Sequence, residues 1–390
     1  MIGDSDDRDA LIAETLWPPP AKIASRGWAT TAEYRVFPDD SRPRFLLPKE
    51  RRAARAILRH FRSGSTASAR LRNFVLRQTL TATGGWPFSR SRVSVSAPTE
   101  ECETIETLLE SLLGQDVCLG VQLGPRRANR KPNLQVLDRN RLPLAFGKIG
   151  LNALTDRLVR SEAEALKFLA TVPLAGVAIP RVLYAGEWRG SSVLLTNTLP
   201  LAHAKRQISQ GERMSAMIEV ARAAGTTWLA PGKSAWLADR HKRLSGEGDP
   251  RIFDRLQDAL MRLAGIDDEW EFGCWHGDWT AWNMAGHDGV ILLWDWERFE
   301  RGVPVGWDPL HHWLRTRLDA VGPSLAEAQG LVAEAPALLH PFGIPAGRAA
   351  SLAHAYLIEL AFRYTSDEQR KAGGRSAYVE DWLLPVLPGR

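Results

Sequence analysis

The chain has 390 residues, of which 44% are hydrophobic and 24% are charged, a composition typical of a folded globular protein that excludes disorder throughout. This length exceeds the usual size of one domain, so we expect two lobes, or one domain with an extension. The net charge is +5, and arginines are concentrated between Arg42 and Arg92, without the regular aromatic interleaving that single-stranded nucleic-acid grooves use.

This arginine-rich block indicates either a solvated face or a surface for phosphate-rich partners or membranes, and we do not expect it to bind nucleic acid. The first residues, MIGDSDDRDA, are acidic and lack the apolar segment of a secretory signal. No apolar run approaches the length that spans a membrane. We therefore expect a cytoplasmic protein without a membrane span. The scattered cysteines Cys102, Cys118 and Cys274 predict buried thiols rather than disulfides or a zinc site.

Residues 1–100 form an N-terminal extension with few clear signals. Within it, the stretch 48–62 predicts a helix with Ala54, Ile57, Leu58 and Phe61 on one face and arginines on the other. A short helix follows and ends at Gly114.

A strand-rich region comes next. Segments 117–124, 133–138 and 142–150 alternate and are separated by turn-forming residues, which predicts three successive antiparallel strands. A helix is expected over 155–170, and two more strands over 179–186 and 191–197. Beyond Gly211 the periodicity is mostly helical. The fold class is therefore α+β, with a small antiparallel β lobe and a larger, mostly α-helical lobe.

The passage 275–299, WHGDWTAWNMAGHDGVILLWDWERF, interrupts the helical region and carries the chemistry. It supplies a loop acid, Asp278, an amide, Asn283, a short apolar strand, and a second acid, Asp295, directly after that strand. Phosphoryl transfer needs a carboxylate that orients a hydroxyl and hard oxygen ligands for Mg²⁺. Each of these residues alone could simply cap a turn or a helix. Their joint spacing favours a catalytic and magnesium-binding site.

This passage resembles the aminoglycoside phosphotransferase and choline kinase family, which is related to the protein kinases. The family motif HGD, with Asn five positions after the Asp and DxE later, stands here as His276-Gly277-Asp278, Asn283 and Asp295-Trp296-Glu297. The resemblance implies that Asp278 is the catalytic base, that Asn283 and Asp295 ligate magnesium, and that His276 supports the loop.

The resemblance extends further along the chain. GWDPLHHW is similar to the family's GDPxxD segment, with Asp308 and Pro309 matching and His312 in place of its second acid. It implies a protein-kinase-like two-lobed fold, with residues 1–100 as the extension, 101–200 as the N-lobe and 201–390 as the C-lobe.

A nucleotide site is expected in the small lobe. Lys148 shares a strand face with Leu144, while Glu162 falls on the apolar face of the following helix, so pairing of the two charges explains both positions. The kinase fold uses such a pair to grip the ATP phosphates. The resemblance also implies that main-chain groups of Asn197 and Leu199 read adenine at a hinge between lobes.

The expected function is ATP- and Mg-dependent transfer of the γ-phosphate to a hydroxyl of a small molecule, namely a sugar, an amino sugar or an aminoglycoside. The chain has 15 tryptophans, and several crowd the catalytic passage, where they could stack on a ligand or pack the core. The sequence leaves the acceptor, the oligomeric state and ATP versus GTP open.

Three other functions could use parts of the same residue set. A kinase-like regulatory protein that binds nucleotide or ligand without catalysis is the main alternative. A protein kinase is disfavoured, because nothing after Glu297 resembles an activation segment and APE element. A metal-dependent hydrolase that uses His311 and His312 is disfavoured, because adjacent residues on a helix point in different directions.

Overall fold

The computed structural model describes residues 7–23, 29–37, 44–59, 78, 82, 92–97, 102–124, 127–201, 207–244, 249–372 and 375–388. Most of the arginine-rich block between residues 42 and 92 lies outside these ranges. The chain divides into two compact units. Unit 1 comprises residues 1–163 and 180–203, and unit 2 comprises residues 164–179 and 204–390.

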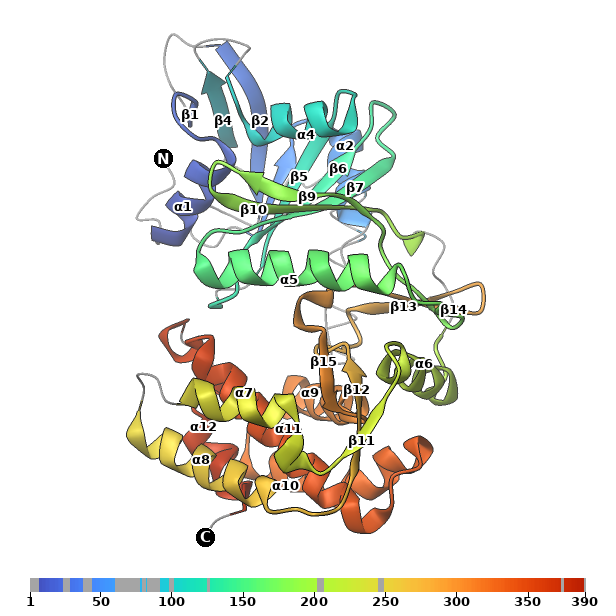
Figure 1. Ribbon diagram of the computed structural model, residues 1–390. Coiled ribbons are helices and arrows are strands. Elements are labelled where there is room, and N and C mark those ends of the chain that lie inside the picture. The colour runs from blue at the N-terminus through green and yellow to red at the C-terminus, as the bar shows by residue number, and fades with distance from the viewer. Residues whose placement is uncertain are drawn as a thin grey trace. The chain divides into compact units, whose positions relative to one another are not determined.

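Unit 1 is built on one sheet of nine strands in the order β1-β4-β2-β3-β5-β6-β7-β10-β9 (Figure 1). Every neighbouring pair in it is antiparallel. The strands are β1 (Lys22–Ile23), β2 (Ala29–Phe37), β3 (Phe45–Pro48), β4 (Arg92–Ala97), β5 (Cys118–Leu123), β6 (Pro132–Leu137), β7 (Pro143–Ile149), β9 (Val182–Trp188) and β10 (Ser191–Asn197).

Both faces of this sheet are covered, because alternate side chains of a strand point to opposite faces. On one face, Phe45 and Leu47 of β3 pack with Ile57 and Leu58 of α2 (Arg51–Arg59). On the other face, Leu46 belongs to a core that also holds residues of α1 (Asp7–Leu16) and α4 (Ile105–Leu113). A capping box at Thr104 begins α4, and Gly114 in the left-handed conformation ends it.

The sequence-based strands at 117–124, 133–138 and 142–150 are confirmed as β5, β6 and β7. The predicted helix over 155–170 is α5 (Ala153–Leu169). The helix expected from residue 48 begins only at Arg51, since residues 45–48 form β3. The first hundred residues, expected as an extension, contribute β1 to β4 to the sheet, where β3 pairs with β5.

Unit 2 is mostly helical (Figure 1). Its core contains tryptophans, leucines and alanines from most of the helices and from two strands, β12 and β15. The helices are α6 (Gln210–Arg222), α7 (Ala235–Leu244), α8 (Pro250–Ala264), α9 (Trp307–Val321), α10 (Leu325–Leu339), α11 (Ala346–Ser366) and α12 (Val379–Trp382).

Two small sheets complete unit 2. One has the order β11-β12-β15, with β11 (Thr227–Leu229), β12 (Trp270–Trp275) and β15 (Glu300–Pro304). The other has the order β13-β14-β8, with β13 (Met284–His287), β14 (Val290–Leu293) and β8 (Val177–Ala178). The structure therefore has the α+β class expected from the sequence. Within the ranges that the structure describes, no helix combines the length and apolar character needed to cross a bilayer.

Candidate active site

The His-Gly-Asp loop follows β12 in unit 2. Its main chain is hydrogen-bonded to the side chain of Asp308 in the first turn of α9. Asp308 Oδ2 accepts a hydrogen bond from the backbone N–H of His276 at 2.8 Å, and its Oδ1 accepts one from Gly277 at 3.2 Å. Burial raises the pKa of Asp308 to about 7, although these two N–H donors act in the opposite direction. The carboxyl group thus fixes the path of the loop through its main chain.

His276 braces the same loop from the side of β14. Its Nε2 donates to the carbonyl of Trp294 at 3.0 Å, and its Nδ1 accepts from the backbone N–H of Asp278 at 3.2 Å. A carbonyl can only accept and an N–H can only donate, so the ring is the neutral Nε2–H tautomer. Burial lowers the pKa of His276 to about 4, which keeps this tautomer at neutral pH.

Gly277 is required at its position for two reasons. Its φ of +80° lies in the left-handed region, and a Cβ built on it would stand 2.2 Å from the carbonyl oxygen of Arg298. The backbone of the loop therefore runs directly against the segment that follows Asp295.

Both oxygens of the Asp278 carboxylate are held by side chains. Oδ2 accepts from Asn283 Nδ2 at 3.0 Å, and Oδ1 accepts from His311 Nε2 at 3.1 Å. Burial raises the pKa of Asp278, but the hydrogen bond from His311 and the charge of Arg315 outweigh it, so the pKa lies below its usual value. The side chain remains 31% exposed. Asp278 is therefore an ionised, partly accessible carboxylate of fixed orientation.

Asn283 and Asp295 are brought together by the β13–β14 hairpin. The backbone N–H of Trp294 donates to the carbonyl of Asn283 at 3.1 Å, one residue before Asp295. Asn283 Nδ2 donates to the carbonyl and to the carboxylate of Asp278, while its Oδ1 accepts no hydrogen bond from any described residue. This oxygen belongs to a side chain that is only 3% exposed.

Asp295 has a left-handed backbone, with φ of 70°, which is uncommon for a residue other than glycine. It stands before a short 3-10 helix (Trp296–Arg298) but its side chain makes no capping hydrogen bond there. The helix-capping interpretation of Asp295 is therefore wrong. An amide oxygen and a carboxylate of this kind are the hard donors that suit magnesium.

In unit 1, Lys148 and Glu162 form an ion pair, with Nζ and Oε2 2.5 Å apart. Glu162 is 3% exposed and lies on the buried face of α5, whereas the neighbouring Glu164 is exposed. The part of α5 in unit 1 is tied to β10, because Ser192 receives a hydrogen bond from Arg160 and donates its backbone N–H to Asp156. The ion pair expected from the sequence is thus present, on a helix that hydrogen bonds connect to β10.

The expected adenine-reading residues lie at the end of β10 and just after it. Asn197 donates its backbone N–H to the carbonyl of Arg181 at 2.9 Å, and its side-chain Oδ1 accepts from the backbone N–H of Arg181 at 2.6 Å. The carbonyl of Leu199 accepts from Leu201 at 2.7 Å. The role of Asn197 and Leu199 in binding adenine stays a prediction.

Two residues that contact the site were missed. The sequence suggests His311 only as a metal ligand together with His312, and no motif points to Tyr356. The two histidines do diverge, since His311 reaches Asp278 while His312 Nδ1 donates to the carbonyl of Trp279 at 3.3 Å. One signal was available: His311 lies three positions after Asp308, on the same helix face.

A stripe along α11 supports the site from behind. The hydroxyl of Tyr356 bonds with His311 Nδ1 at 3.0 Å, and Arg363 donates to the carbonyl of Gly277 at 2.7 Å. Directly after the end of α11, Asp367 pairs with Arg298. The helix and its C-cap residue thus contact the loop, His311 and the segment after Asp295.

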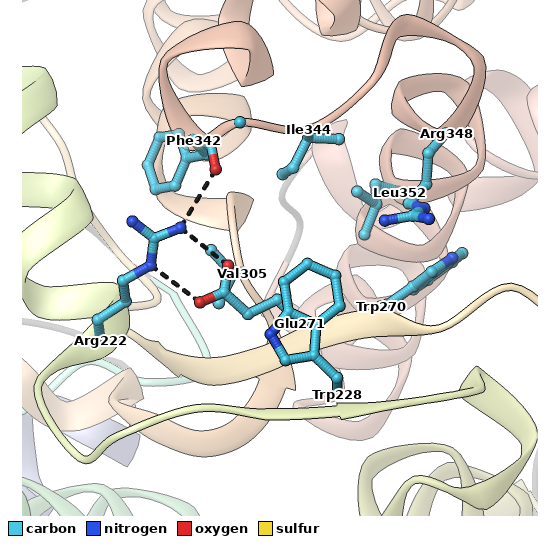
Figure 2. A pocket seen from close by; sticks show the side chains of 10 residues that line it. Arg222, Trp228, Trp270, Glu271, Val305, Phe342, Ile344, Arg348 and Leu352 are labelled. Carbon is cyan, nitrogen blue, oxygen red and sulfur yellow. Dashed lines mark hydrogen bonds and ion pairs between the residues drawn. The ribbon is translucent and has the colours of Figure 1, made fainter.

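A separate cavity of about 100 Å³ opens in unit 2 beside β11 and β12 (Figure 2). Arg222 crosses it and binds both carboxylate oxygens of Glu271 at 2.9 Å, and it also donates to the carbonyl of Phe342 at 3.2 Å. None of the expected site residues lines this cavity.

No family model matches the chain, and no curated protein matches it. Solved structures do show similarity. A thermostable mutant of an aminoglycoside phosphotransferase is 16% identical with a TM-score of 0.44, and the match covers 70% of this chain and 95% of that one. A spectinomycin phosphotransferase in complex with ADP and spectinomycin is 12% identical, with a TM-score of 0.39 and coverage of 72% and 97%. An amicoumacin kinase is 11% identical, with a TM-score of 0.39 and coverage of 69% and 90%.

Unit 1 contains the nine-stranded sheet and the Lys148–Glu162 ion pair. Unit 2 contains the His-Gly-Asp loop and the β13–β14 hairpin. The chain thus has the α+β class expected from the sequence, with one unit built on an antiparallel sheet and one mostly helical unit.

Proposed function

We propose that this chain is an ATP- and magnesium-dependent phosphotransferase that moves the γ-phosphoryl group to a hydroxyl of a small molecule. The observation that carries the proposal is the state of Asp278. It is ionised and partly exposed, its two oxygens are held by Asn283 and His311, and its loop is clamped by Asp308. A carboxylate that served only to stabilise the loop would need none of this exposure.

In the proposed reaction, Asp278 accepts a hydrogen bond from the acceptor hydroxyl and orients its oxygen toward the γ-phosphorus. As the new P–O bond forms and the bond to the β-phosphate oxygen breaks, the hydroxyl proton passes to Asp278. The products are a phosphate ester and ADP. A bound magnesium ion supplies charge neutralisation at the β- and γ-phosphates.

The remaining residues have binding roles. Asn283, through its Oδ1, and Asp295 would hold the metal, since both offer hard oxygen donors on one hairpin. Lys148 would bind the α- and β-phosphates, with Glu162 fixing its ammonium group. Asn197 and Leu199 would read adenine through their main chain.

For the acceptor, we favour a sugar or amino sugar over a polycationic aminoglycoside. The charges acting on Asp278 and its neighbour His311 include those of Arg315 and Arg363, which disfavour a polycation. Glu271, an acid that precedes the His-Gly-Asp loop, is bound by Arg222 and so offers no free carboxylate to a polycation. Most of the nearby tryptophans pack the core, with Trp275, Trp279 and Trp296 fully buried.

The proposal is tested by measuring MgATP turnover with glucose, glucosamine and kanamycin as acceptors. Asp278→Asn should lower kcat by about 100-fold to 10,000-fold, the usual contribution of a positioned general base. Lys148→Met should mainly weaken nucleotide binding. The control is Asp254→Asn, because Asp254 is an exposed acid on α8.

The alternative, a kinase-like regulatory protein without catalysis, predicts a different pattern. It would bind MgATP and be stabilised against heat by it, yet show no acceptor-dependent turnover. If Asp278→Asn turned over like the wild type, the role assigned to Asp278 would be wrong.

A further inference from the structure

We propose that His311, oriented by Tyr356, is a positioning residue that sets the plane of the Asp278 carboxylate. The inference rests on the proposed function, in which Asp278 accepts the proton of the acceptor hydroxyl. It adds a residue that lies outside the His-Gly-Asp motif and outside the Asn283 and Asp295 pair.

The contacts form a short chain from α11 through α9 to the catalytic loop. His311 Nε2 lies 3.1 Å from Asp278 Oδ1, and His311 Nδ1 lies 3.0 Å from the hydroxyl of Tyr356. His311 is 3% exposed and Tyr356 is 1% exposed. The ring of His311 packs edge-on against Tyr356 at 6.0 Å and against Trp275 at 6.3 Å, so it cannot turn freely.

The proton positions in this series of hydrogen bonds follow from Asp278 at one end and Tyr356 at the other. A carboxylate only accepts, so His311 Nε2 must carry the hydrogen that faces Asp278. Burial and the charges of Arg363 and Arg315 lower the pKa of His311, which favours the neutral ring with a free Nδ1 lone pair. Burial raises the pKa of Tyr356 well above its usual value, so its hydroxyl stays protonated and donates to that lone pair. The Asp278 carboxylate and the Tyr356 hydroxyl therefore both select the Nε2–H tautomer of His311.

The consequence for Asp278 is a fixed carboxylate plane. The χ2 torsion of aspartate is broad, so a carboxylate with one anchor could rotate about it. Asn283 holds Oδ2 and His311 holds Oδ1, and together they leave the second lone pair of each oxygen for the acceptor hydroxyl. Without His311, Asp278 could rotate toward the guanidinium of Arg315, whose charge already acts on it.

The two residues that hold the His-Gly-Asp loop from α9 lie close together in the sequence. Asp308 and His311 lie one helical turn apart on α9, and they hold respectively the main chain and the side chain of the catalytic loop. One helix start thus sets both where the loop runs and how its carboxylate is turned.

The test compares His311→Leu, His311→Gln and Tyr356→Phe, with glucose, glucosamine and kanamycin as acceptors. We expect His311→Leu to lower kcat by about 10-fold to 100-fold, the range for a lost hydrogen bond to a charged group, with the KM for MgATP within about twofold. His311→Gln offers an N–H near the place of Nε2 and should recover part of the loss. Tyr356→Phe should lower kcat less, and should have no further effect in the His311→Gln background, where no imidazole tautomer remains to select.

Matched controls are His340→Gln and Tyr378→Phe, which change an exposed histidine and a 38% exposed tyrosine outside the site. Both should retain wild-type kcat. If His311→Leu does not fold, His311→Gln and Tyr356→Phe still decide the case.

A second readout does not depend on turnover. Nitrogen-15 spectra of the histidine side chains should show His311 as the Nε2–H tautomer at pH 7, and Tyr356→Phe should reduce that preference. An Nδ1–H tautomer in the wild type overturns the inference, as does wild-type kcat in both His311 variants. If the wild type transfers phosphate to no acceptor, the proposed function fails, while the tautomer still decides whether this chain of contacts exists.

Discussion

Replacement of Asp308 tests how strongly the His-Gly-Asp loop depends on a side chain that lies 31 positions after Gly277 and 32 positions after His276. The 2% exposed carboxyl group of Asp308 receives two backbone N–H groups, from His276 and Gly277, at 2.8 and 3.2 Å. Asp308→Asn keeps one carbonyl oxygen as an acceptor but turns an NH₂ group toward the other donor. Asp308→Ala removes both acceptors.

The size of the effect follows from the number of donors left without a partner. Each unsatisfied buried N–H costs about 1–3 kcal/mol, so Asp308→Asn should lower the free energy of unfolding by about 1–3 kcal/mol and Asp308→Ala by about 2–6 kcal/mol. In a unit of this size each kcal/mol lowers Tm by about 2–4 °C. Asp308→Asn should therefore lower Tm by about 2–12 °C, and kcat should fall with it because the loop carries Asp278.

The effect should also depend on pH, with a definite sign. Because burial raises the pKa of Asp308 to about 7, the folded protein keeps a proton there that the unfolded chain has released. The contribution of Asp308 to stability is therefore present at low pH and is lost as the pH rises through about 7. The difference in Tm between wild type and Asp308→Asn should narrow between pH 5.5 and pH 8.

The measurement is thermal unfolding at pH 5.5 and pH 8. It compares the wild type with Asp308→Asn, Asp308→Ala and the exposed-site control Asp254→Asn. The control should change the free energy of unfolding by less than about 0.5 kcal/mol. If Asp308→Ala melts with the control and retains wild-type turnover, the carboxyl group of Asp308 does not hold the loop.

Two further predictions concern the same unit. Gly289 has a similar φ of +86°, but a Cβ built on it would have no atom within 4 Å, so Gly289→Ala should lower the free energy of unfolding by about 1–2 kcal/mol. Gly277→Ala should lower it by more, because its Cβ would also clash with Arg298. Equal losses in urea unfolding would show that this clash is relieved cheaply. Burial and the charge of Arg213 lower the pKa of His312 to about 4. As the pH falls from about 6.5 to about 4, His312 therefore binds a proton in the unfolded chain but stays neutral in the folded protein. Stability should decline over that range, and His312→Gln should make the decline between pH 7.5 and pH 5 shallower; identical slopes would contradict the assignment.

The strands β5 to β7 and the helix α5 could be predicted from the sequence because each shows its periodicity locally. The position of Lys148 on one strand face and of Glu162 on the apolar helix face was enough to predict their pairing, since neither charge can be buried alone. The HGD motif and its spacing likewise located Asp278, Asn283 and Asp295 within one passage.

The strands of the first hundred residues were missed for the opposite reason. β1 has two residues and β3 has four, too few for a period to stand out. β2 finds its partners in β3 and β4, and β3 finds one in β5, so these strands are defined by pairing between distant segments. Such register is set by tertiary contacts that local propensity does not report.

His311 shows the same limit inside the site. His311 Nε2 lies 3.1 Å from Asp278 Oδ1, but 33 positions separate the two residues along the chain. Adjacent histidines suggest metal ligands, although their side chains diverge on a helix and make poor joint ligands. What the sequence did contain was the spacing of Asp308 and His311 on one face of α9. Once Asp308 is known to contact the main chain of the loop, the next turn of that helix must face the same loop, and a buried histidine there needs an acceptor for its N–H. The nearest carboxylate on that loop is Asp278, so the contact follows from the helix geometry and the need to satisfy a buried donor.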